Sequence, residues 1–263
     1  MSASNLSIGM NGATGRMGAR IIALIQEGPS VFLGAALERA DHPAIGRDVG
    51  EVLGLGPLGV ALRDTLEGPL DAMIDFSSPA GTMAIARACA EMRVPLVIGT
   101  TGLGPEHRAE LKKLSSTIPI LPSSNFSKAV NLLMRLSGEA AKALGDAADI
   151  EIVERHHRFK KDAPSGTALR LAEIVGEAIG SQRYAHGRQG NIGERTRGEI
   201  GLHALRTGDN PGEHTVVFGM MGECLELTHR ALNRDGFARG AIDAARFLVG
   251  RPPRLYDMGD LLA

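Results

Sequence analysis

Three glycines at every third position from 12 to 18 constrain the fold of this chain more than any other feature. They follow a short apolar run at residues 6–10 and precede apolar residues within 21–25 that share one face of a helix. This order predicts a strand, a tight turn and a helix whose first N–H groups attract a pyrophosphate. The spacing departs from the usual dinucleotide fingerprint, because Ala13 stands in place of its first glycine. Alone, the pattern is a weak signal.

Glu38 and Arg39 strengthen this interpretation. They end the next apolar run, residues 31–37, about 20 residues beyond the glycines, where the fingerprint has an acid. Glu38 can accept hydrogen bonds from the ribose diol of NADH, whereas Arg39 can pair with the 2′-phosphate of NADPH. An exposed ion pair at a strand end is the alternative, and such pairs contribute little stability. Because ligands bind at strand ends of open α/β sheets, we favour the cofactor site.

Strand-like and helical patterns alternate along the first half of the chain: residues 71–77, 82–92, 94–98, 105–114 and 118–121. The alternation predicts an α/β fold in which the N-terminal part forms a Rossmann-like, doubly wound parallel sheet. Gly99-Thr100-Thr101 and Ser123-Ser124-Asn125-Phe126 each follow a predicted strand. Taken separately they are ordinary loops. Because parallel strands end at one edge of a sheet, we expect the two loops to flank a nicotinamide ring there.

The pattern changes beyond residue 127. A helix, an alternating strand, a second helix and three successive strands are predicted at residues 129–144, 149–154, 166–179, 199–206, 213–218 and 224–229. The glycine- and arginine-rich stretch between the second helix and these strands, residues 187–197, predicts a mobile loop. This succession predicts a separate α+β domain. We expect residues 1–127 to form a dinucleotide-binding domain, to which residues 239–263 return, and residues 128–238 to form the second domain.

Residues 154–167 gather titratable groups beside an expected helix start. His156 and Lys160 can exchange protons near neutral pH if the site perturbs the lysine. His157 adds positive charge, and Pro164-Ser165-Gly166-Thr167 opens a helical pattern whose first N–H groups attract a carboxylate or phosphate. A basic surface loop before a capped helix is the alternative, and it would be preferred for an isolated histidine pair. The complete set favours a functional site.

Composition excludes several classes of function. The 29 basic and 30 acidic side chains give a net charge of -1, which argues against a general nucleic-acid binder. Cys89 and Cys224 lie far apart in the sequence and form no C-x-x-C pair, so no metal site is predicted. Residues 1–5 lack a charged leader, and no apolar run reaches the length of about 18 residues needed to span a membrane. We therefore expect a cytoplasmic protein without a membrane partner.

In order and spacing, these motifs resemble those of the bacterial dihydrodipicolinate reductase family over nearly the whole chain. The resemblance is carried by Gly-Ala-Thr-Gly-Arg-Met-Gly at 12–18, Glu38-Arg39, Gly99-Thr100-Thr101, Ser124-Asn125-Phe126-Ser127 and the segment from Glu154 to Ala168. It implies reduction of 4-hydroxy-tetrahydrodipicolinate, or of the derived dihydrodipicolinate, to tetrahydrodipicolinate in diaminopimelate and lysine biosynthesis. The implied cofactor is NADH or NADPH.

The resemblance also assigns roles to residues. His156 would donate or accept a proton and Lys160 would donate one, while the dicarboxylate substrate would be held by His157, Ser165, Gly166 and Thr167. The second domain would bind this substrate and form a homotetramer through its sheet. Together with the loops above, the resemblance predicts cofactor contacts at Gly12, Ala13, Thr14, Gly15, Arg16, Met17, Glu38, Arg39, Gly99, Thr100, Thr101, Ser123, Ser124, Asn125 and Phe126.

Two other functions are compatible with part of the pattern. Another nicotinamide-dependent reductase of an amino or imino acid would share the glycine turn but has no evident need for the histidine segment. A non-catalytic dinucleotide sensor would keep the glycines and Glu38, but His156 and Lys160 argue against it.

Overall fold

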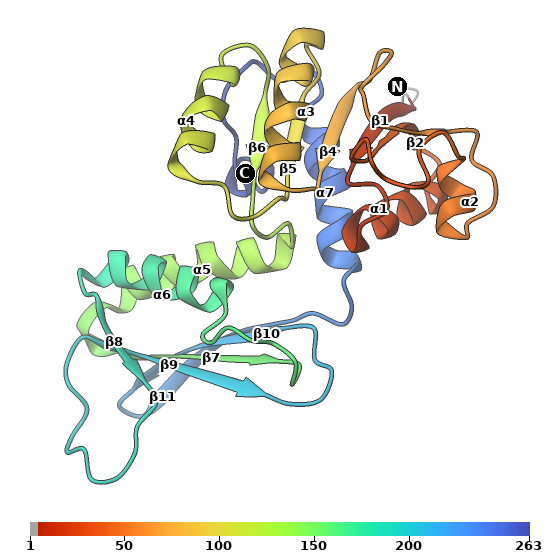
Figure 1. Cartoon of the computed structure of the whole chain (residues 1–263). Coiled ribbons are helices and arrows are strands. Elements are labelled where there is room, and N and C mark those ends of the chain that lie inside the picture. Colours follow the sequence, from red (N-terminus) through yellow and green to blue (C-terminus); the bar gives the residue numbers. More distant parts are fainter. Residues whose placement is uncertain (1–4) are drawn as a thin grey trace. The chain divides into compact units, whose positions relative to one another are not determined.

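The computed structural model describes residues 5–263 (Figure 1). Positions 1–4, on which most of the expectation of a missing leader rests, lie outside the described residues. The chain divides into two compact units, of which the first runs to Ser127 and resumes from Asp235 to Ala263, and the second is Lys128–Arg234. The sequence pattern places this last boundary at residue 238; it lies at Arg234 because one continuous helix begins at Asp235.

The first unit is built on a parallel six-stranded sheet with the strand order β3-β2-β1-β4-β5-β6. The order reverses between β1 and β4, which is the arrangement of a doubly wound sheet. The predicted Rossmann-like fold is therefore confirmed. The strands are β1 (Leu6–Asn11), β2 (Val31–Leu37), β3 (Leu62–Arg63), β4 (Ala72–Asp75), β5 (Leu96–Ile98) and β6 (Ile120–Pro122).

Helices cover both faces of this sheet because its central strands are apolar on both sides. In β4, Ile74 packs in the cluster that includes Ile21 of α1 and Ala241 of α7, whereas Met73 packs in the cluster that includes Cys89 of α3. The helices are α1 (Arg16–Glu27), α2 (Val49–Leu53), α3 (Pro79–Met92), α4 (Pro105–Leu114), α7 (Asp235–Leu248) and α8 (Met258–Leu261).

The C-terminal segment belongs to this first unit. Arg20 of α1 forms a two-point ion pair with Asp235 at the start of α7, with N–O distances of 2.7 and 2.7 Å. Beyond α7, the N–H of Tyr256 donates to the carbonyl oxygen of Ile120 in β6 over 2.8 Å. Helix packing and backbone pairing together close the unit.

The second unit contains a mixed five-stranded sheet with the order β11-β10-β7-β9-β8. Strand β7 is parallel to β9 and antiparallel to β10, which confirms the predicted α+β class. Buried residues of α5 and α6 pack with Ile150, Ile152 and Phe218 on one face of the sheet. The elements are α5 (Lys128–Leu144), the short 3-10 helix η1 (Gly145–Ala147), β7 (Asp149–His156), α6 (Gly166–Ile179), β8 (Arg183–His186), β9 (Glu199–Arg206), β10 (Glu213–Met220) and β11 (Glu223–Arg230).

The arginine-rich loop after β8 is anchored to the sheet. Arg188 donates two hydrogen bonds to Glu151 of β7, at 3.0 and 2.7 Å, and Arg195 donates a third at 3.1 Å. Burial raises the pKa of Glu151, but its hydrogen bonds from Arg188, His203 and Arg195 outweigh this effect and lower the pKa to about 2. The charged pairs restrain the ends of a loop that the sequence predicted to be mobile.

Among residues 5–263, no helix combines the length and the apolar character needed to cross a bilayer.

Candidate functional site

The glycine turn joins β1 to α1, and its backbone lies close to the backbone at Phe76. Gly12 has a φ of 77°, and a Cβ on it would lie 2.4 Å from the carbonyl oxygen of Phe76. Only glycine fits this conformation and this gap. Gly15 caps α1, and within the described chain no side chain caps that helix and no acid occupies its first turn. Its first N–H groups therefore suit an anion such as a pyrophosphate.

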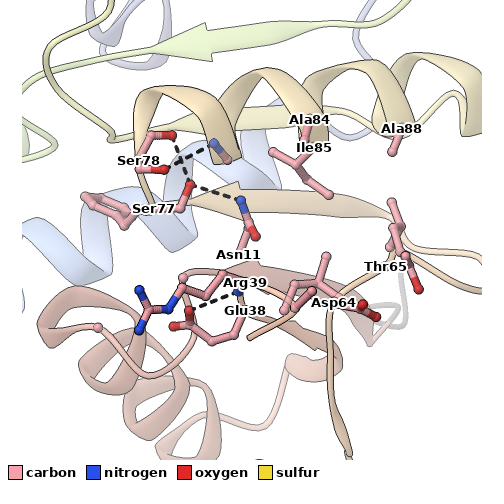
Figure 2. Close-up of a pocket in the computed structure, with 17 residues that line it drawn as sticks. Asn11, Glu38, Arg39, Asp64, Thr65, Ser77, Ser78, Ala84, Ile85 and Ala88 are labelled. Atoms are coloured by element: carbon pink, nitrogen blue, oxygen red, sulfur yellow. Dashed lines mark hydrogen bonds between the residues drawn. The ribbon is translucent and has the colours of Figure 1, made fainter. Parts of the chain in front are cut away.

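A cavity of about 670 Å³ lies at the strand ends beside this turn. Glu38 and Arg39 border it after β2, while Ala84, Ile85 and Ala88 of α3 lie across from them (Figure 2). The volume is in the usual range for a small-molecule site. The cavity combines an apolar wall, a carboxylate and the glycine backbone, as a nucleoside and its phosphates require.

Glu38 and Arg39 have different surroundings. Oε1 of Glu38 accepts hydrogen bonds from the N–H of Thr14, at 3.1 Å, and from its hydroxyl, at 2.6 Å. Glu38 thus fixes the glycine turn as well as bordering the cavity. The guanidinium of Arg39 pairs with the exposed Asp41 at 3.1 Å, and the Arg39 side chain is 71% exposed. Its guanidinium can therefore turn toward a ligand at little cost.

The predicted loop Gly99-Thr100-Thr101, which follows β5, is held by a buried carboxylate that was not identified from the sequence. Asp75, at the end of β4, is fully buried and accepts hydrogen bonds from Asn11 Nδ2 at 2.7 Å and from the hydroxyls of Ser77, Thr82 and Thr100 at 2.5, 2.6 and 2.7 Å. Thr100 in turn accepts from the N–H of Ser77 at 2.9 Å. The sequence signal that could have identified Asp75 is the presence of an aspartate at the end of an apolar strand.

The predicted loop from Ser123 to Phe126, which follows β6, is held by hydrogen bonds between residues close together in the chain. The hydroxyl of Ser123 donates to the Asn125 carbonyl oxygen at 2.8 Å, and Asn125 Oδ1 accepts from the N–H of Ser127 at 2.9 Å. Phe126 is buried, and its ring centroid lies 5.8 Å from that of Phe76. Ser124 and Thr101 are exposed, as is Arg16 at the glycine turn.

A second group of residues lies in the second unit, where β7 ends at His156. His156 Nδ1 lies 2.6 Å from Oε2 of the buried Glu154. In the loop that follows, the ammonium of Lys160 lies 3.0 Å from Asp162, which lowers the pKa of that carboxyl. Nδ1 of His157 is buried and has no hydrogen-bond partner within the described part of the chain. Proton-carrying groups and cations are therefore gathered at one strand end.

Helix α6 begins beside these groups. The hydroxyl of its cap, Ser165, accepts from the N–H of Ala168 at 3.2 Å, and the Ser165 N–H donates to Glu154 at 3.0 Å. Ser165 is thus buried and already bonded, whereas Gly166 is exposed. Within the described residues, no acid occupies the first turn of α6. The exposed part of this helix start is Gly166, and N–H groups at such a position attract a carboxylate.

His214 on β10 joins this cluster and was missed in the sequence. Its Nε2 lies 3.0 Å from the Ser165 hydroxyl, and its ring centroid lies 5.2 Å from that of His156. Burial, reinforced by the charges of His156 and His229, lowers the pKa of His214 to about 3. It is neutral at physiological pH. The sequence predicted a strand at residues 213–218, but nothing in that pattern indicated that His214 is buried beside α6.

We expect His214 to make stability fall as the pH decreases. The unfolded chain takes up this proton near pH 6.5 and the folded chain only near pH 3, so the unfolded state binds more protons between them. The free energy of unfolding then decreases by up to about 1.4 kcal/mol per pH unit in this window. Denaturant titrations at pH 6.5 and 5 should show a smaller decrease for His214→Gln than for the wild type. His186→Gln, at an exposed histidine, is the control; equal decreases in all three proteins would contradict this role.

Comparison with known proteins places both units in one family. The family description "Dihydrodipicolinate reductase, N-terminus" matches residues 6–126, and "Dihydrodipicolinate reductase, C-terminus" matches residues 129–262. The chain is 47% identical to the 4-hydroxy-tetrahydrodipicolinate reductase of Halorhodospira halophila, over 98% of this chain and 99% of that protein. It is 46% identical to the enzyme of the same name from Syntrophus aciditrophicus, over 96% and 97%.

A solved structure agrees in fold. Dipicolinate-bound dihydrodipicolinate reductase from Paenisporosarcina sp. TG-14 superposes with a TM-score of 0.79 at 23% identity, covering 96% of this chain and 97% of that one. The two family matches together cover almost the whole of the described chain. The chain therefore belongs to the dihydrodipicolinate reductase family.

Proposed function

We propose that this protein reduces 4-hydroxy-tetrahydrodipicolinate, or the dihydrodipicolinate formed from it by loss of water, to tetrahydrodipicolinate in diaminopimelate and lysine biosynthesis. Relatives at 46 and 47% identity carry the name of this reductase. The observation that carries the proposal is the grouping of His156, Lys160 and the start of α6 at the end of β7. This grouping offers proton transfer and carboxylate binding together, which a dinucleotide sensor does not need.

The first unit fits a nicotinamide dinucleotide. The gap at Gly12 admits no side chain, the start of α1 suits a pyrophosphate, and Glu38 borders a cavity large enough for a nucleoside. When bound, NADH or NADPH supplies the hydride. Thr100, fixed by Asp75, and the loop from Ser123 to Phe126 lie at the ends of β5 and β6 and position the nicotinamide end.

The second unit fits a cyclic dicarboxylate, and the Paenisporosarcina relative is described with dipicolinate bound. One carboxylate binds the N–H groups at Gly166 and Thr167, with the side chain of His157 nearby. A helix start alone contributes about 0.3–1 kcal/mol at an exposed site. Lys160 must therefore supply part of the binding, and the substrate competes with Asp162 for its ammonium.

His156 and Lys160 handle the proton that must accompany the hydride. Glu154 occupies Nδ1 of His156, so Nε2 is the nitrogen that exchanges a proton with the substrate. The ammonium of Lys160 donates a proton to the reduced ring and is held nearby by Asp162. Positioned acid catalysis of this kind is worth about 10²- to 10⁴-fold in rate.

The decisive experiment is an assay of NADH and NADPH oxidation with the condensation product of aspartate semialdehyde and pyruvate. We expect rapid oxidation that depends on this product. The alternative, another reductase of an amino or imino acid, is tested in parallel with a panel of such acids and their carbonyl precursors. Oxidation with a member of that panel, and none with the condensation product, would favour the alternative.

We further propose that the protein is a cytoplasmic homotetramer formed through the second sheet. Helices α5 and α6 pack with Ile150 and Ile152 on one face, whereas Val153 alternates with them on β7 and Leu205 is exposed at the end of β9. A partner sheet would bury such side chains. Both cysteines are free, which suits a reducing compartment. Light scattering of the purified protein measures the assembly; a monomer would contradict it.

The cofactor preference should depend on Glu38 and Arg39 in opposite ways. Arg39→Ala should raise the Michaelis constant for NADPH about tenfold, equivalent to about 1.4 kcal/mol, because the pair with the 2′-phosphate is lost. NADH should change only a few-fold. Glu38→Ala should impair NADH more, since the ribose diol loses its acceptor. Steady-state kinetics with both cofactors test this, with the exposed Arg47→Ala as a control. An equal effect of Arg39→Ala on both cofactors would show that Arg39 does not select between them.

A further inference from the structure

Glu154 is the centre of a hydrogen-bond network in the second unit. Its side chain is 1% exposed, and it accepts from His156 Nδ1 at 2.6 Å, from two nitrogens of Arg206 at 2.8 Å each, and from the N–H of Ser165 at 3.0 Å. These partners come from the end of β7, the end of β9 and the cap of α6. One carboxylate therefore connects the proposed proton carrier to the proposed carboxylate-binding helix start.

Glu154 is charged in this network. Burial raises the pKa of Glu154, but the hydrogen bonds from Arg206 and His156 outweigh burial and hold the pKa below its usual range. A carboxylate accepts hydrogen bonds and donates none, so the nitrogen facing it must carry a proton. His156 is therefore held with a proton on Nδ1, and any proton that it exchanges is on Nε2.

The surroundings of Nε2 leave room on one side. A Cβ built on Gly212 would lie 3.0 Å from Nε2, so the missing side chain keeps this nitrogen uncovered. His214 contacts the ring edge-on from β10, with the ring planes 74° apart. The His156 side chain is 12% exposed. The ring is thus fixed in orientation while one nitrogen stays accessible.

We propose that Glu154 is the positioning residue of the reaction. It holds His156 in the tautomer that presents Nε2 to the substrate, and it fixes the position of this ring relative to the start of α6. The inference rests on the proposed function of His156. Glu154 touches neither substrate nor cofactor. Its effect on turnover passes through His156, whereas its bond to Ser165 sets where the substrate carboxylate lies relative to that ring.

Glu151 provides a matched control on the same strand. It is also a glutamate held by arginines and by a histidine, His203 at 2.6 Å, but it alternates with Ile150 and Ile152 and so faces the other side of the sheet. Glu151→Gln removes the same charge at a similar network outside the proposed site. We expect it to keep turnover within about twofold of the wild type.

The test measures kcat and KM for Glu154→Gln, Glu154→Asp, His156→Gln and the double variant Glu154→Gln/His156→Gln. Glu154→Gln should lower kcat about 10- to 100-fold, because an amide can donate as well as accept and no longer requires the proton of the His156 ring to be on Nδ1. Arg206, His214 and the Lys160–Asp162 pair, the other charged or titratable groups around this ring, are unchanged in all four proteins. Glu154→Asp should recover part of the rate.

Coupling separates positioning from a general structural effect. If Glu154 acts through His156, the double variant should be no more than about threefold slower than His156→Gln alone. Losses that multiply in the double variant would overturn the proposal. Normal turnover of His156→Gln would instead overturn the proposed role of His156, whereas normal turnover of Glu154→Gln beside a slow His156→Gln would overturn only the positioning role.

A measurement on the wild-type protein decides the point even if Glu154→Gln does not fold. Nitrogen NMR of the histidine rings distinguishes a protonated from an unprotonated ring nitrogen, and the spectrum of His156→Gln identifies the His156 signals. At pH values where the His156 ring is neutral, we expect Nδ1 to be protonated and Nε2 to be unprotonated. The opposite tautomer would overturn the proposal.

Discussion

Replacing His156 with glutamine or Lys160 with methionine should lower kcat about 10²- to 10⁴-fold, while the dissociation constant of the cofactor changes less than about threefold. Both residues lie in the second unit, whereas the glycine turn and the cavity beside Glu38 lie in the first. Each replacement removes a proton carrier but leaves the nucleotide site intact. The loss should therefore appear in turnover and not in cofactor binding.

Steady-state turnover and direct titration of the cofactor test this separation. His186→Gln and Lys142→Met are matched controls, because both wild-type side chains are exposed and lie outside the residues 154–167. Near-normal turnover of both His156→Gln and Lys160→Met would contradict the assignment of the proton carriers. A parallel loss of cofactor affinity would indicate that the variants disturb the fold.

Replacing Asp75 with alanine should lower the free energy of unfolding by about 3 kcal/mol or more and raise the dissociation constant of the cofactor at least about tenfold. Four side-chain donors converge on this buried carboxylate, and hydrogen bonds to charged groups contribute about 1.5–3 kcal/mol each, although not additively. Without Asp75, Thr100 loses the bond that fixes its loop at the end of β5. Affinity should decrease because that loop must then be ordered by the ligand.

Denaturant titration and cofactor binding measure the two effects. Asp71→Ala is the control: Asp71 lies just before the same strand, and its carboxylate accepts a hydrogen bond from the N–H of Ser7 at 2.8 Å. We expect it to cost about 1 kcal/mol and to leave cofactor affinity unchanged. If Asp75→Ala is no more harmful than Asp71→Ala, the Asp75 network has no special role.

Most of the first unit could be predicted because its signals are local. Apolar runs such as residues 94–98 are short and bounded, and the helix after Gly15 repeats its apolar positions at the helical period, so few neighbouring residues suffice to define each element. The strand β8 could not be predicted in the same way. Its sequence, Arg183–His186, is mostly exposed and polar, and it becomes a strand only by pairing with β9.

The candidate site was predictable in its residue types but not in its contacts. The segment from His156 to Thr167 carries an unusual density of titratable groups and a helix-start pattern, and these belong to consecutive residues. Glu154 lay at the edge of that segment, but its bonds to Arg206 and Ser165 join residues 52 and 11 positions apart. His214 is 49 positions from Ser165. The periodicity of apolar residues along the chain does not indicate contacts between residues so far apart in the sequence.

The sequence by itself determined the order of most strands and helices, the glycine turn and the family to which the chain belongs. The tertiary structure alone decided which polar groups share a buried partner: Asp75 holds Thr100, and Glu154 holds His156. The physical reason is that apolar periodicity depends on neighbours along the chain, whereas a buried carboxylate is stable only where donors from separate strands and helices converge. That convergence exists only once the sheets have formed.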